Sequence, residues 1–328
     1  VGLIRLPSLN TKHLDAITHV GLCSGHSALA RADIVHYHAL GPSSLAWVPR
    51  LARKKTVVTV HGLDWQREKW GPVARSFLRF CEWTALRFAD ATIVVSRTLE
   101  DYFRAKGWGS VHYIPNGNAL PGPASEEPIR RLGLVPGGYV LFVGRLVPEK
   151  GLHVLVRAHR VSAPEWPLVV AGGGHFTDEY VESCRRDAAG SARFLGPVYG
   201  EALASLQQHA AVVVVPSSLE GLSIALLEAM SHGRPVLASD IPENREVLAD
   251  AGVSFRTGDA EDLGRLLCEL LASPDRRGGV GGRARARLGG GGDRGRGGGG
   301  AGGGSPTGGG RGGGEGAGRS AGGAGGGP

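Results

Sequence analysis

Residues 211–230 read AVVVVPSSLEGLSIALLEAM, and this stretch decides which fold the chain can adopt. The continuous apolar run at 211–215, which ends at Pro216, is typical of a strand buried on both faces of a parallel sheet. Ser223 is a favourable N-cap, so a helix is expected over 224–231. A buried strand that passes through a short turn into an apolar helix is the repeating unit of α/β domains.

The same unit recurs on both sides of this stretch. Short runs rich in β-branched residues are each followed by a loop and a helical pattern, which predicts parallel strands covered by helices. The predicted strands fall into two sets, at 33–38, 56–60, 91–95 and 112–114, and at 139–143, 168–171, 193–195, 211–215 and 235–238. We therefore expect two doubly wound, Rossmann-like parallel-sheet domains in tandem, with ligands bound at the carboxyl ends of the strands.

Proline and glycine mark the expected domain boundaries. Four prolines between 118 and 136 indicate a linker at 123–136, so the first domain is predicted to span 1–122 and the second 137–274. Glycine makes up 29 of the last 51 residues, and none of these 51 is aromatic. A segment with so little apolar surface cannot offset its ordering entropy, so 275–328 is predicted to be a disordered Gly/Arg-rich tail.

The basic composition belongs mainly to this tail. Most of the formal net charge of +7 comes from nine arginines beyond residue 273, where only three acidic residues lie. A nearly neutral body is not the surface that nucleic-acid binding requires, so nucleic acid is not expected as its partner. The arginine and glycine clusters of the tail leave open a second class of function, which is RNA binding through the tail.

Cysteine usage and hydropathy indicate a cytoplasmic protein. The four cysteines are widely spaced without a C-x-x-C pair, which is typical of core thiols in a reducing compartment. We expect neither a signal peptide nor a membrane span, since no apolar run reaches about eighteen residues. The stretch 65–88 mixes aromatic residues with arginines, so peripheral contact with the inner face of an anionic membrane is an alternative to a half-buried surface helix.

Glu228 is the only carboxylate in the apolar helix expected at 224–231. A buried carboxylate is destabilising unless it is paired or hydrogen-bonded. Two adjacent sugar hydroxyls can donate to one carboxylate, so Glu228 is a candidate ligand for a sugar. The alternative is a side chain that faces solvent or pairs with Arg234.

A second set of charged residues follows the strand expected at 139–143. Arg145 and Lys150 lie in the loop after this strand. Two cations near the carboxyl end of a strand suit a diphosphate, because arginine binds it through a planar fork and lysine as a point charge. The alternative is a solvated loop in which Arg145 pairs with Glu149.

Together these segments resemble the signature of glycosyltransferase family 4. Glu220 and Glu228 form its E-x7-E pattern, within E-G-L-S-x-x-x-L-E-A-M after a V-V-V-P-S strand, and 144–151 match its G-R-x-x-x-x-K-G element. The resemblance covers about 4–272 and implies a GT-B fold, in which two Rossmann-like domains face each other. It also implies transfer of a hexose or related sugar from a nucleotide-sugar donor to a glycan, lipid-linked or small-molecule acceptor. Such transfer would retain the anomeric configuration and need neither a metal nor a cofactor.

The resemblance assigns roles to residues by their place in these motifs. It implies that Glu220 contacts the donor sugar in catalysis and that Glu228 binds the ribose of the nucleotide. The donor diphosphate would meet Arg145, Lys150, Gly221, Leu222 and Ser223, and the nucleotide pocket would include Gly172, Gly173 and Val198.

In the first domain the resemblance points to His61 as a catalytic residue across from the donor sugar. His61 lies just past the strand expected at 56–60, and a satisfied turn residue is the alternative there. His36 and His38 are expected in the core or in a turn. The loops after the next strands contribute the remaining candidates, which are Ser96, Asn116 and Gly117.

Members of the family begin with a strand and a Gly-rich loop that have no counterpart in this sequence, so the first domain is expected to be incomplete. An inactive fragment is therefore an alternative to an active transferase. Two other enzyme classes share the fold, nucleotide-sugar epimerases and sugar-phosphate synthases, and the E-x7-E context disfavours the epimerase.

Overall fold

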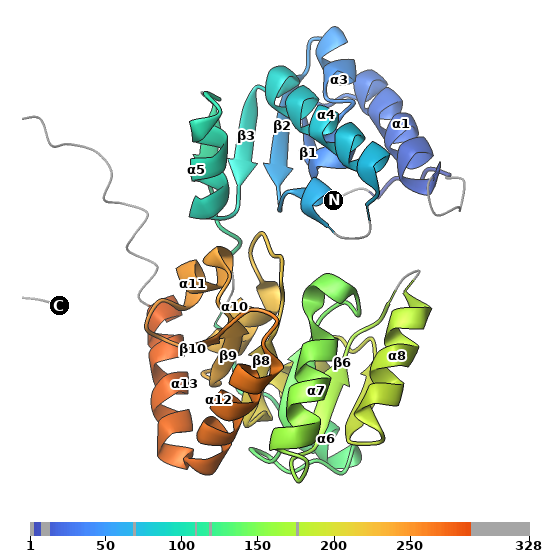
Figure 1. The fold of residues 1–328 in the computed structure, drawn as a ribbon. Coiled ribbons are helices and arrows are strands. Elements are labelled where there is room, and N and C mark those ends of the chain that lie inside the picture. Colours follow the sequence, from blue (N-terminus) through green and yellow to red (C-terminus); the bar gives the residue numbers. More distant parts are fainter. Residues whose placement is uncertain are drawn as a thin grey trace, which may run out of the picture. The chain divides into compact units, whose positions relative to one another are not determined.

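The computed structural model describes residues 3–7, 14–67, 70–108, 110–117, 120–174 and 177–289. All of them belong to one compact unit, residues 1–292, which contains two parallel β-sheets (Figure 1). The two predicted domains and their parallel strands are therefore confirmed. The nine expected strands all form, and their ends agree with the prediction within one residue.

The first sheet has four parallel strands in the order β1-β2-β3-β4. Its strands are β1 (Ile34–His38), β2 (Lys55–Val60), β3 (Ala91–Val94) and β4 (Val111–Tyr113). Its helices are α1 (Leu14–Leu29), α2 (Leu40–Ser43), α3 (Trp47–Leu51), the 3₁₀ turn η1 (Asp64–Gln66), α4 (Pro72–Phe88) and α5 (Arg97–Ala105). The helices α1 to α4 pack against one another.

The second sheet has six parallel strands in the order β10-β9-β8-β5-β6-β7. Its strands are β5 (Val140–Val143), β6 (Leu168–Ala171), β7 (Ala192–Gly196), β8 (Val212–Val215), β9 (Val236–Ser239) and β10 (Val253–Phe255). Its helices are α6 (Glu127–Arg131), the 3₁₀ turn η2 (Pro148–Lys150), α7 (Leu152–Ser162), α8 (Asp178–Ala188), α9 (Gly200–His209), α10 (Ile224–Ser231), α11 (Pro242–Leu248), α12 (Ala260–Ala272) and α13 (Pro274–Gly289). The edge strand β10 had not been predicted.

The strand order places a topological switch between β5 and β8. The chain starts at β5, moves outward through β6 to β7, then returns to the other side of β5 at β8 and moves outward again. The loops after β5 and β8 consequently leave the same edge of the sheet in opposite directions. In open α/β sheets ligands bind in the crevice that forms at this point.

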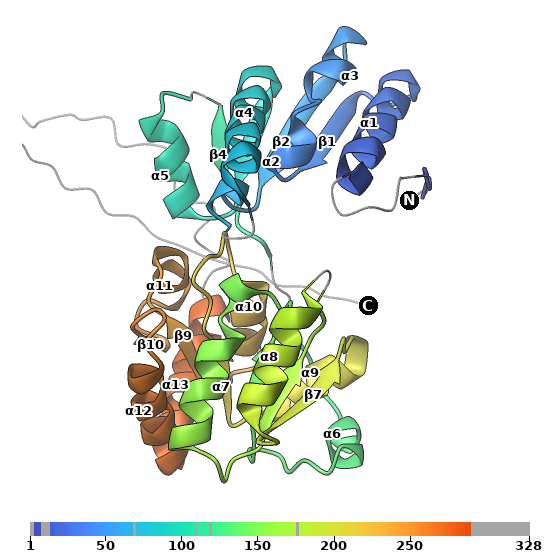
Figure 2. The same cartoon turned by 45° about the vertical axis from the view of Figure 1, so that its right-hand side comes forward.

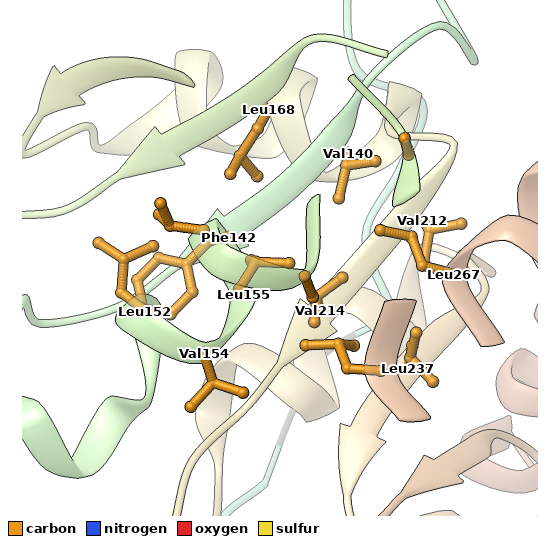
Figure 3. Close-up of a cluster of buried hydrophobic side chains, with 14 of the residues drawn as sticks. Val140, Phe142, Leu152, Val154, Leu155, Leu168, Val212, Val214, Leu237 and Leu267 are labelled. Atoms are coloured by element: carbon orange, nitrogen blue, oxygen red, sulfur yellow. The ribbon is translucent and has the colours of Figure 1, made fainter. Parts of the chain in front are cut away.

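Both faces of the second sheet are buried, which explains its continuous apolar strands. Successive residues of a strand point to opposite faces, so Val140 and Phe142 join one core cluster, whereas Leu141 joins the other. Figure 3 shows the first cluster, in which Leu152 and Leu155 of α7 meet the strands. The helices α7, α8 and α12 cover that face, and α6, α9, α10 and α13 cover the opposite one (Figures 1 and 2).

The predicted linker at 123–136 is partly wrong. Residues 127–131 form α6, and Ile129 and Leu134 are buried in the second core cluster with Leu206 of α9. The second domain therefore begins before residue 137. Prolines and charged residues dominate this segment, so its sequence resembles a linker. Its two buried apolar residues, Ile129 and Leu134, are isolated in the sequence, and only the packing against α9 reveals them.

The predicted boundary at 274 and the start of the tail at 275 are also wrong. Residues 274–289 form α13, in which Val280 and Ala284 are buried in the two core clusters of the second domain. Arg287 of α13 donates to the carbonyl oxygens of Glu246 and Val247 near the end of α11, which would otherwise lack hydrogen-bond donors. The part of the predicted tail at 290–328 lies outside the described residues.

All four cysteines lie among the described residues. The four cysteines are free, with Cys81 and Cys184 buried and Cys23 and Cys268 half-buried. Burial raises the pKa of the Cys81 thiol to about 11. Among the described residues, none of the helices combines the length and the apolarity that a membrane crossing requires.

Two neighbouring glycines of α13 test whether this helix is packed as described. A Cβ atom on Gly281 would lie 2.1 Å from the Gly233 carbonyl oxygen, whereas one on the exposed Gly282 would meet nothing within 4 Å. We expect Gly281→Ala to lower the free energy of unfolding by about 1–3 kcal/mol through overpacking. Gly282→Ala, the matched control, should raise it by about 0.4–1 kcal/mol because alanine favours helix. Urea denaturation measures both, and equal effects would contradict the packing of α13.

Candidate active site

A pocket of about 280 Å³ lies at the switch point between β5 and β8. Gly144 and Arg145 line it from the loop after β5, and Ser217, Glu220 and Glu228 line it from the segment after β8. Glycine allows these loops to approach each other: Gly151 has a φ of 69°, and a Cβ atom there would lie 2.0 Å from the Pro216 carbonyl oxygen. The predicted donor motifs therefore converge on one cavity.

Lys150 and Glu220 form an ion pair across this contact. The Lys150 Nζ atom lies 2.6 and 2.7 Å from the two carboxylate oxygens of Glu220, and the Ser217 hydroxyl donates to the same carboxylate at 2.6 Å. The Glu220 side chain is only 7% exposed, so its charge needs both partners. The sequence had assigned these two residues to different parts of the donor and had not predicted that they pair.

The N-terminus of α10 opens on the same pocket. Ser223 caps the helix as predicted, since its side-chain oxygen accepts from the Leu226 amide at 3.4 Å. Leu222, Ser223 and Ile224 line the pocket. The amides of a first helical turn have no intrahelical acceptor, so this end of α10 can bind an anion together with a nearby cation.

Glu228 lines the pocket one helical turn further on. Its carboxylate is half-buried and accepts a 2.7 Å hydrogen bond from the Gln207 side-chain amide of α9. The described residues include no ion pair between Glu228 and Arg234, so that alternative is wrong. One amide bond leaves acceptor capacity on the carboxylate, which hydroxyl groups of a ligand could use.

Arg145 projects from the loop after β5 and lines both this pocket and the neighbouring one. Its expected alternative partner, Glu149, instead accepts from Arg67 at 3.2 Å and is 4% exposed. No carboxylate in the described part of the chain forms an ion pair with Arg145. An exposed guanidinium beside a helix N-terminus is a suitable anion-binding group.

A second cavity of about 220 Å³ adjoins the first and includes residues that follow strands of both sheets. His61 and Asn116 line it, together with Arg145, Lys150 and Glu220, which it shares with the first pocket. The backbones meet closely there, because a Cβ atom on Gly221 would lie 1.6 Å from the His61 carbonyl oxygen. His61 and Asn116 therefore lie beside residues of the two predicted donor motifs.

His61 belongs to a stack of three histidines. The His38 Nδ1 and His61 Nε2 atoms are 3.0 Å apart, the rings of His36 and His38 stack at 4.4 Å, and the His36 Nε2 atom is 2.7 Å from the Thr59 hydroxyl. Burial and the neighbouring imidazoles lower the pKa of both His36 and His61 below the ordinary 6.5. The bond between His38 and His61 needs one neutral ring as acceptor, so the two cannot both be protonated while it persists.

The other predicted residues lie outside these two cavities. Ser96 is buried and caps α5 by accepting from the Leu99 amide at 3.3 Å. Gly172 is packed against Gly144, where a Cβ atom would lie 1.8 Å from the carbonyl oxygen. The remaining three are Gly173, beside Pro197, Val198, against the second core cluster, and the exposed Gly117.

Three residues of the site had not been identified as such. Gln207 lies in an ordinary helical pattern, and only the fold brings it to Glu228. Arg67 and Glu149 are 82 positions apart, and nothing local to either predicts that they pair. Within the described residues, no group of three or more histidine, cysteine, aspartate or glutamate side chains could hold a metal ion, and this includes the histidine stack.

Comparison with known proteins identifies two family models along the chain. Residues 1–117 match the model described as a glycosyl transferase 4-like domain, and residues 130–287 match the model described as glycosyl transferases group 1. The second match runs through α13 almost to its end, in agreement with the corrected boundary.

Curated relatives are glycosyltransferases and synthases. An alpha-maltose-1-phosphate synthase of Mycolicibacterium smegmatis is 32% identical over 263 residues, which cover 70% of this chain and 67% of the relative. A phosphatidyl-myo-inositol mannosyltransferase of the same organism is 36% identical over 264 residues, or 78% of this chain and 66% of the relative. An Escherichia coli O-antigen chain mannosyltransferase B is 32% identical over 171 residues, or 50% and 43%.

Solved structures share the fold. A sucrose-phosphate synthase of Thermosynechococcus elongatus superposes with a TM-score of 0.71 at 24% identity, covering 84% of this chain and 73% of that one. The Anabaena protein HepE, solved in complex with UDP-glucose, superposes with a TM-score of 0.73 at 20% identity, covering 83% and 77%.

The histidine stack makes a prediction about protonation. In His38→Gln the pKa of His61 should rise toward 6.5, because the substitution removes an imidazolium that disfavours a second positive charge. NMR titration of the imidazole protons measures this shift. His112→Gln, on β4 and outside the stack, is the control and should leave His61 unchanged.

An unchanged His61 titration in His38→Gln would contradict the coupling.

Because the folded-state pKa values of His36 and His61 lie below those of the unfolded chain, the unfolded state binds more protons as the pH falls. The contribution of these histidines to stability should therefore be present above pH 6.5 and decline as the pH falls through their folded-state pKa values.

Proposed function

This chain belongs to the family 4, group 1 glycosyltransferases and has their GT-B fold, and from that premise we propose that it moves a sugar from a nucleotide-sugar donor to an acceptor hydroxyl. The observation that carries the proposal is the convergence of Arg145, Lys150, Glu220 and Glu228 with the N-terminus of α10 in the switch-point pocket. These groups complement the parts of a nucleotide sugar, which are a diphosphate, a ribose and a hexose.

The proposed donor runs along the loops after β5 and β8. The diphosphate would lie against Arg145, Lys150 and the first amides of α10, where positive charge and free donors coincide. The ribose would donate to the remaining acceptor sites of Glu228. HepE, a structural neighbour, is solved in complex with UDP-glucose, which supports a nucleotide sugar as donor.

Donor binding would require the Lys150 ammonium to interact with two anionic groups, the Glu220 carboxylate and the diphosphate. In the described structure its ammonium is held by Glu220 at 2.6 and 2.7 Å. A diphosphate placed beside it would compete with that carboxylate. Glu220 would then be free to accept hydrogen bonds from the hydroxyls of the donor sugar, next to the Gly221 backbone.

The proposed reaction breaks the bond between the anomeric carbon and the diphosphate oxygen and forms a bond between that carbon and the acceptor oxygen. The proton of the acceptor hydroxyl passes to the leaving diphosphate. Arg145, Lys150 and the α10 amides would stabilise the charge that develops on the leaving diphosphate, which is the largest electrostatic demand of this step. They supply positive charge where a metal ion would otherwise do so, so we propose transfer that is independent of a metal. We further propose retention of configuration, with His61 facing the sugar across the second cavity.

The acceptor and the location of the protein are also proposals. The relatives named above include a phosphatidyl-myo-inositol mannosyltransferase and an O-antigen chain mannosyltransferase, which supports a hexosyl donor and a lipid-linked or glycan acceptor. We place the protein in the cytoplasm, at the inner face of a membrane.

Donor binding is tested by calorimetric titration of UDP, GDP and their hexose conjugates. Lys150→Met should weaken nucleoside diphosphate binding about 10- to 100-fold, since a charge-assisted contact contributes about 1.5–3 kcal/mol. Glu220→Gln should bind UDP and GDP at least as tightly as the unchanged protein does, because Lys150 loses its competing carboxylate. The same variant should lose sugar transfer. Glu228→Ala should weaken binding of the nucleoside diphosphates and of their hexose conjugates.

The matched control is Glu182→Gln, which removes an exposed carboxylate on α8 that pairs with Arg185. It should bind donors as the unchanged protein does. If the folded protein binds none of the four ligands, the proposal fails for this chain.

The stereochemical course and the role of metal are tested on the product. NMR coupling at the anomeric proton should report the same anomeric configuration in the product as in the donor. Turnover should be unaffected by EDTA, because Arg145 and Lys150 provide the charge at the diphosphate. Inversion, or loss of activity that returns on adding a divalent cation, would contradict the corresponding half of the proposal.

A further inference from the structure

A cavity of the first domain that does not include the residues of the switch-point pocket has an apolar lining. It has a volume of about 840 Å³, and its walls come from α1, α2, the segment that follows α2, and α4. Ala74, Phe77 and Leu78 of α4 line it together with Pro42, Leu45 and Trp47. We call this cavity the α4 groove. A cavity of this size and lining suits an extended apolar group of a ligand.

The outer wall of the α4 groove is an exposed row of aromatic rings. Phe77, Phe80 and Trp83 recur every three residues, so they lie along one side of α4, and they are 48%, 54% and 48% exposed. The rings of Phe80 and Trp83 stack with centroids 5.9 Å apart. Val73 extends the row at 85% exposure. Contiguous exposed apolar surface of this kind marks a surface that binds a partner.

The charges on α4 indicate which partner fits. The exposed charged residues of this helix are all cationic, namely Arg75, Arg79 and Arg87. Its one carboxylate, Glu82, is 4% exposed and is held by the Trp65 indole at 2.8 Å and the Lys106 ammonium at 2.5 Å. A helix that presents aromatic rings and arginines, without an exposed acid, complements the anionic surface of a bilayer.

One short loop joins the α4 groove to the candidate active site. Asp64 lines the groove at the start of η1, three residues after His61, which lines the second cavity. Asp64 also accepts from Arg67 at 3.1 Å, and Arg67 in turn donates to Glu149 beside Lys150. The α4 groove and the second cavity are therefore lined by residues of one loop.

From these observations we propose that the α4 groove holds the hydrocarbon tail of a lipid acceptor, which the protein takes from an anionic membrane surface. This inference rests on the proposed transferase function and specifies its acceptor class. Phe77, Phe80 and Trp83 enter the interfacial layer of the bilayer, and the three arginines bind its anionic headgroups. Burial of its methylene groups in the groove holds the tail, while the headgroup lies near His61.

Membrane binding is tested first with the full chain and vesicles of two compositions. The protein should co-sediment with phosphatidylcholine vesicles that contain 30% phosphatidylglycerol (about one lipid in three, enough to give an anionic surface) and not with pure phosphatidylcholine. Arg75→Gln, Arg79→Gln and Arg87→Gln combined should reduce this binding at least about tenfold, because each cation near the surface contributes to it. As a matched control, Arg157→Gln, Arg160→Gln and Arg186→Gln combined remove three arginines from the second domain and should bind as before.

The α4 groove itself is tested with cis-parinaric acid, an anionic fatty acid that fluoresces in apolar surroundings. Ala74→Trp fills the groove and should abolish the fluorescence gain, with thermal unfolding unchanged. If this variant destabilises the fold, Gly41→Leu fills the opposite wall, where a Cβ atom would lie 3.9 Å from Leu78. Undiminished parinarate binding in a folded, filled variant would overturn the groove as the tail site.

Two further measurements separate this inference from its alternatives. Nucleotide-sugar calorimetry on Ala74→Trp should match that of the unchanged protein, so loss of donor binding reports on the proposed function and loss of parinarate binding reports on the groove. Sedimentation velocity should show no self-association through α4. A dimer that Phe77→Ser, Phe80→Ser and Trp83→Ser abolish, without binding to anionic vesicles, would overturn the proposal in favour of an interface between two copies.

Discussion

The switch-point pocket of this molecule depends on the contact between the loops after β5 and β8. The two strands are neighbours in the sheet, and their loops can touch only because position 151 has no side chain and adopts a left-handed conformation against the Pro216 carbonyl. That contact holds Lys150 over Glu220. The residue before Gly151 and the segment after Pro216 thus become parts of one pocket, although they are far apart in the chain.

Charges around this pocket are largely compensated within the protein. Glu220 neutralises Lys150, and Arg67 neutralises Glu149. The lowered pKa of His61 keeps this side chain uncharged near neutral pH, so it adds no positive charge beside the pocket. Arg145 and the N-terminus of α10 are therefore the groups that remain to attract an anion, and a bound diphosphate would redistribute the charge of Lys150 rather than meet a preformed cationic cluster.

The loop after β2 connects three features of the structure within seven residues. His61 lines the cavity next to Glu220, Asp64 lines the α4 groove, and Arg67 pairs with Glu149. Because these residues lie in and beside the 3₁₀ turn η1, a ligand in the groove and a ligand in the pocket would meet the same loop. The donor and the acceptor would therefore contact neighbouring residues of one chain segment.

The sequence by itself determined the nine predicted strands, their parallel arrangement, the cap at Ser223 and the motifs that line the switch-point pocket. These follow from local apolar runs, turns and capping chemistry, which act within a few residues. Tertiary structure decided α13, whose glycines disfavour a helix but whose Val280 and Ala284 are buried. It also decided which charged and polar groups meet, as in Lys150 with Glu220, Gln207 with Glu228 and His38 with His61. Such partners are chosen by distance in space, and no local pattern in the chain records that distance.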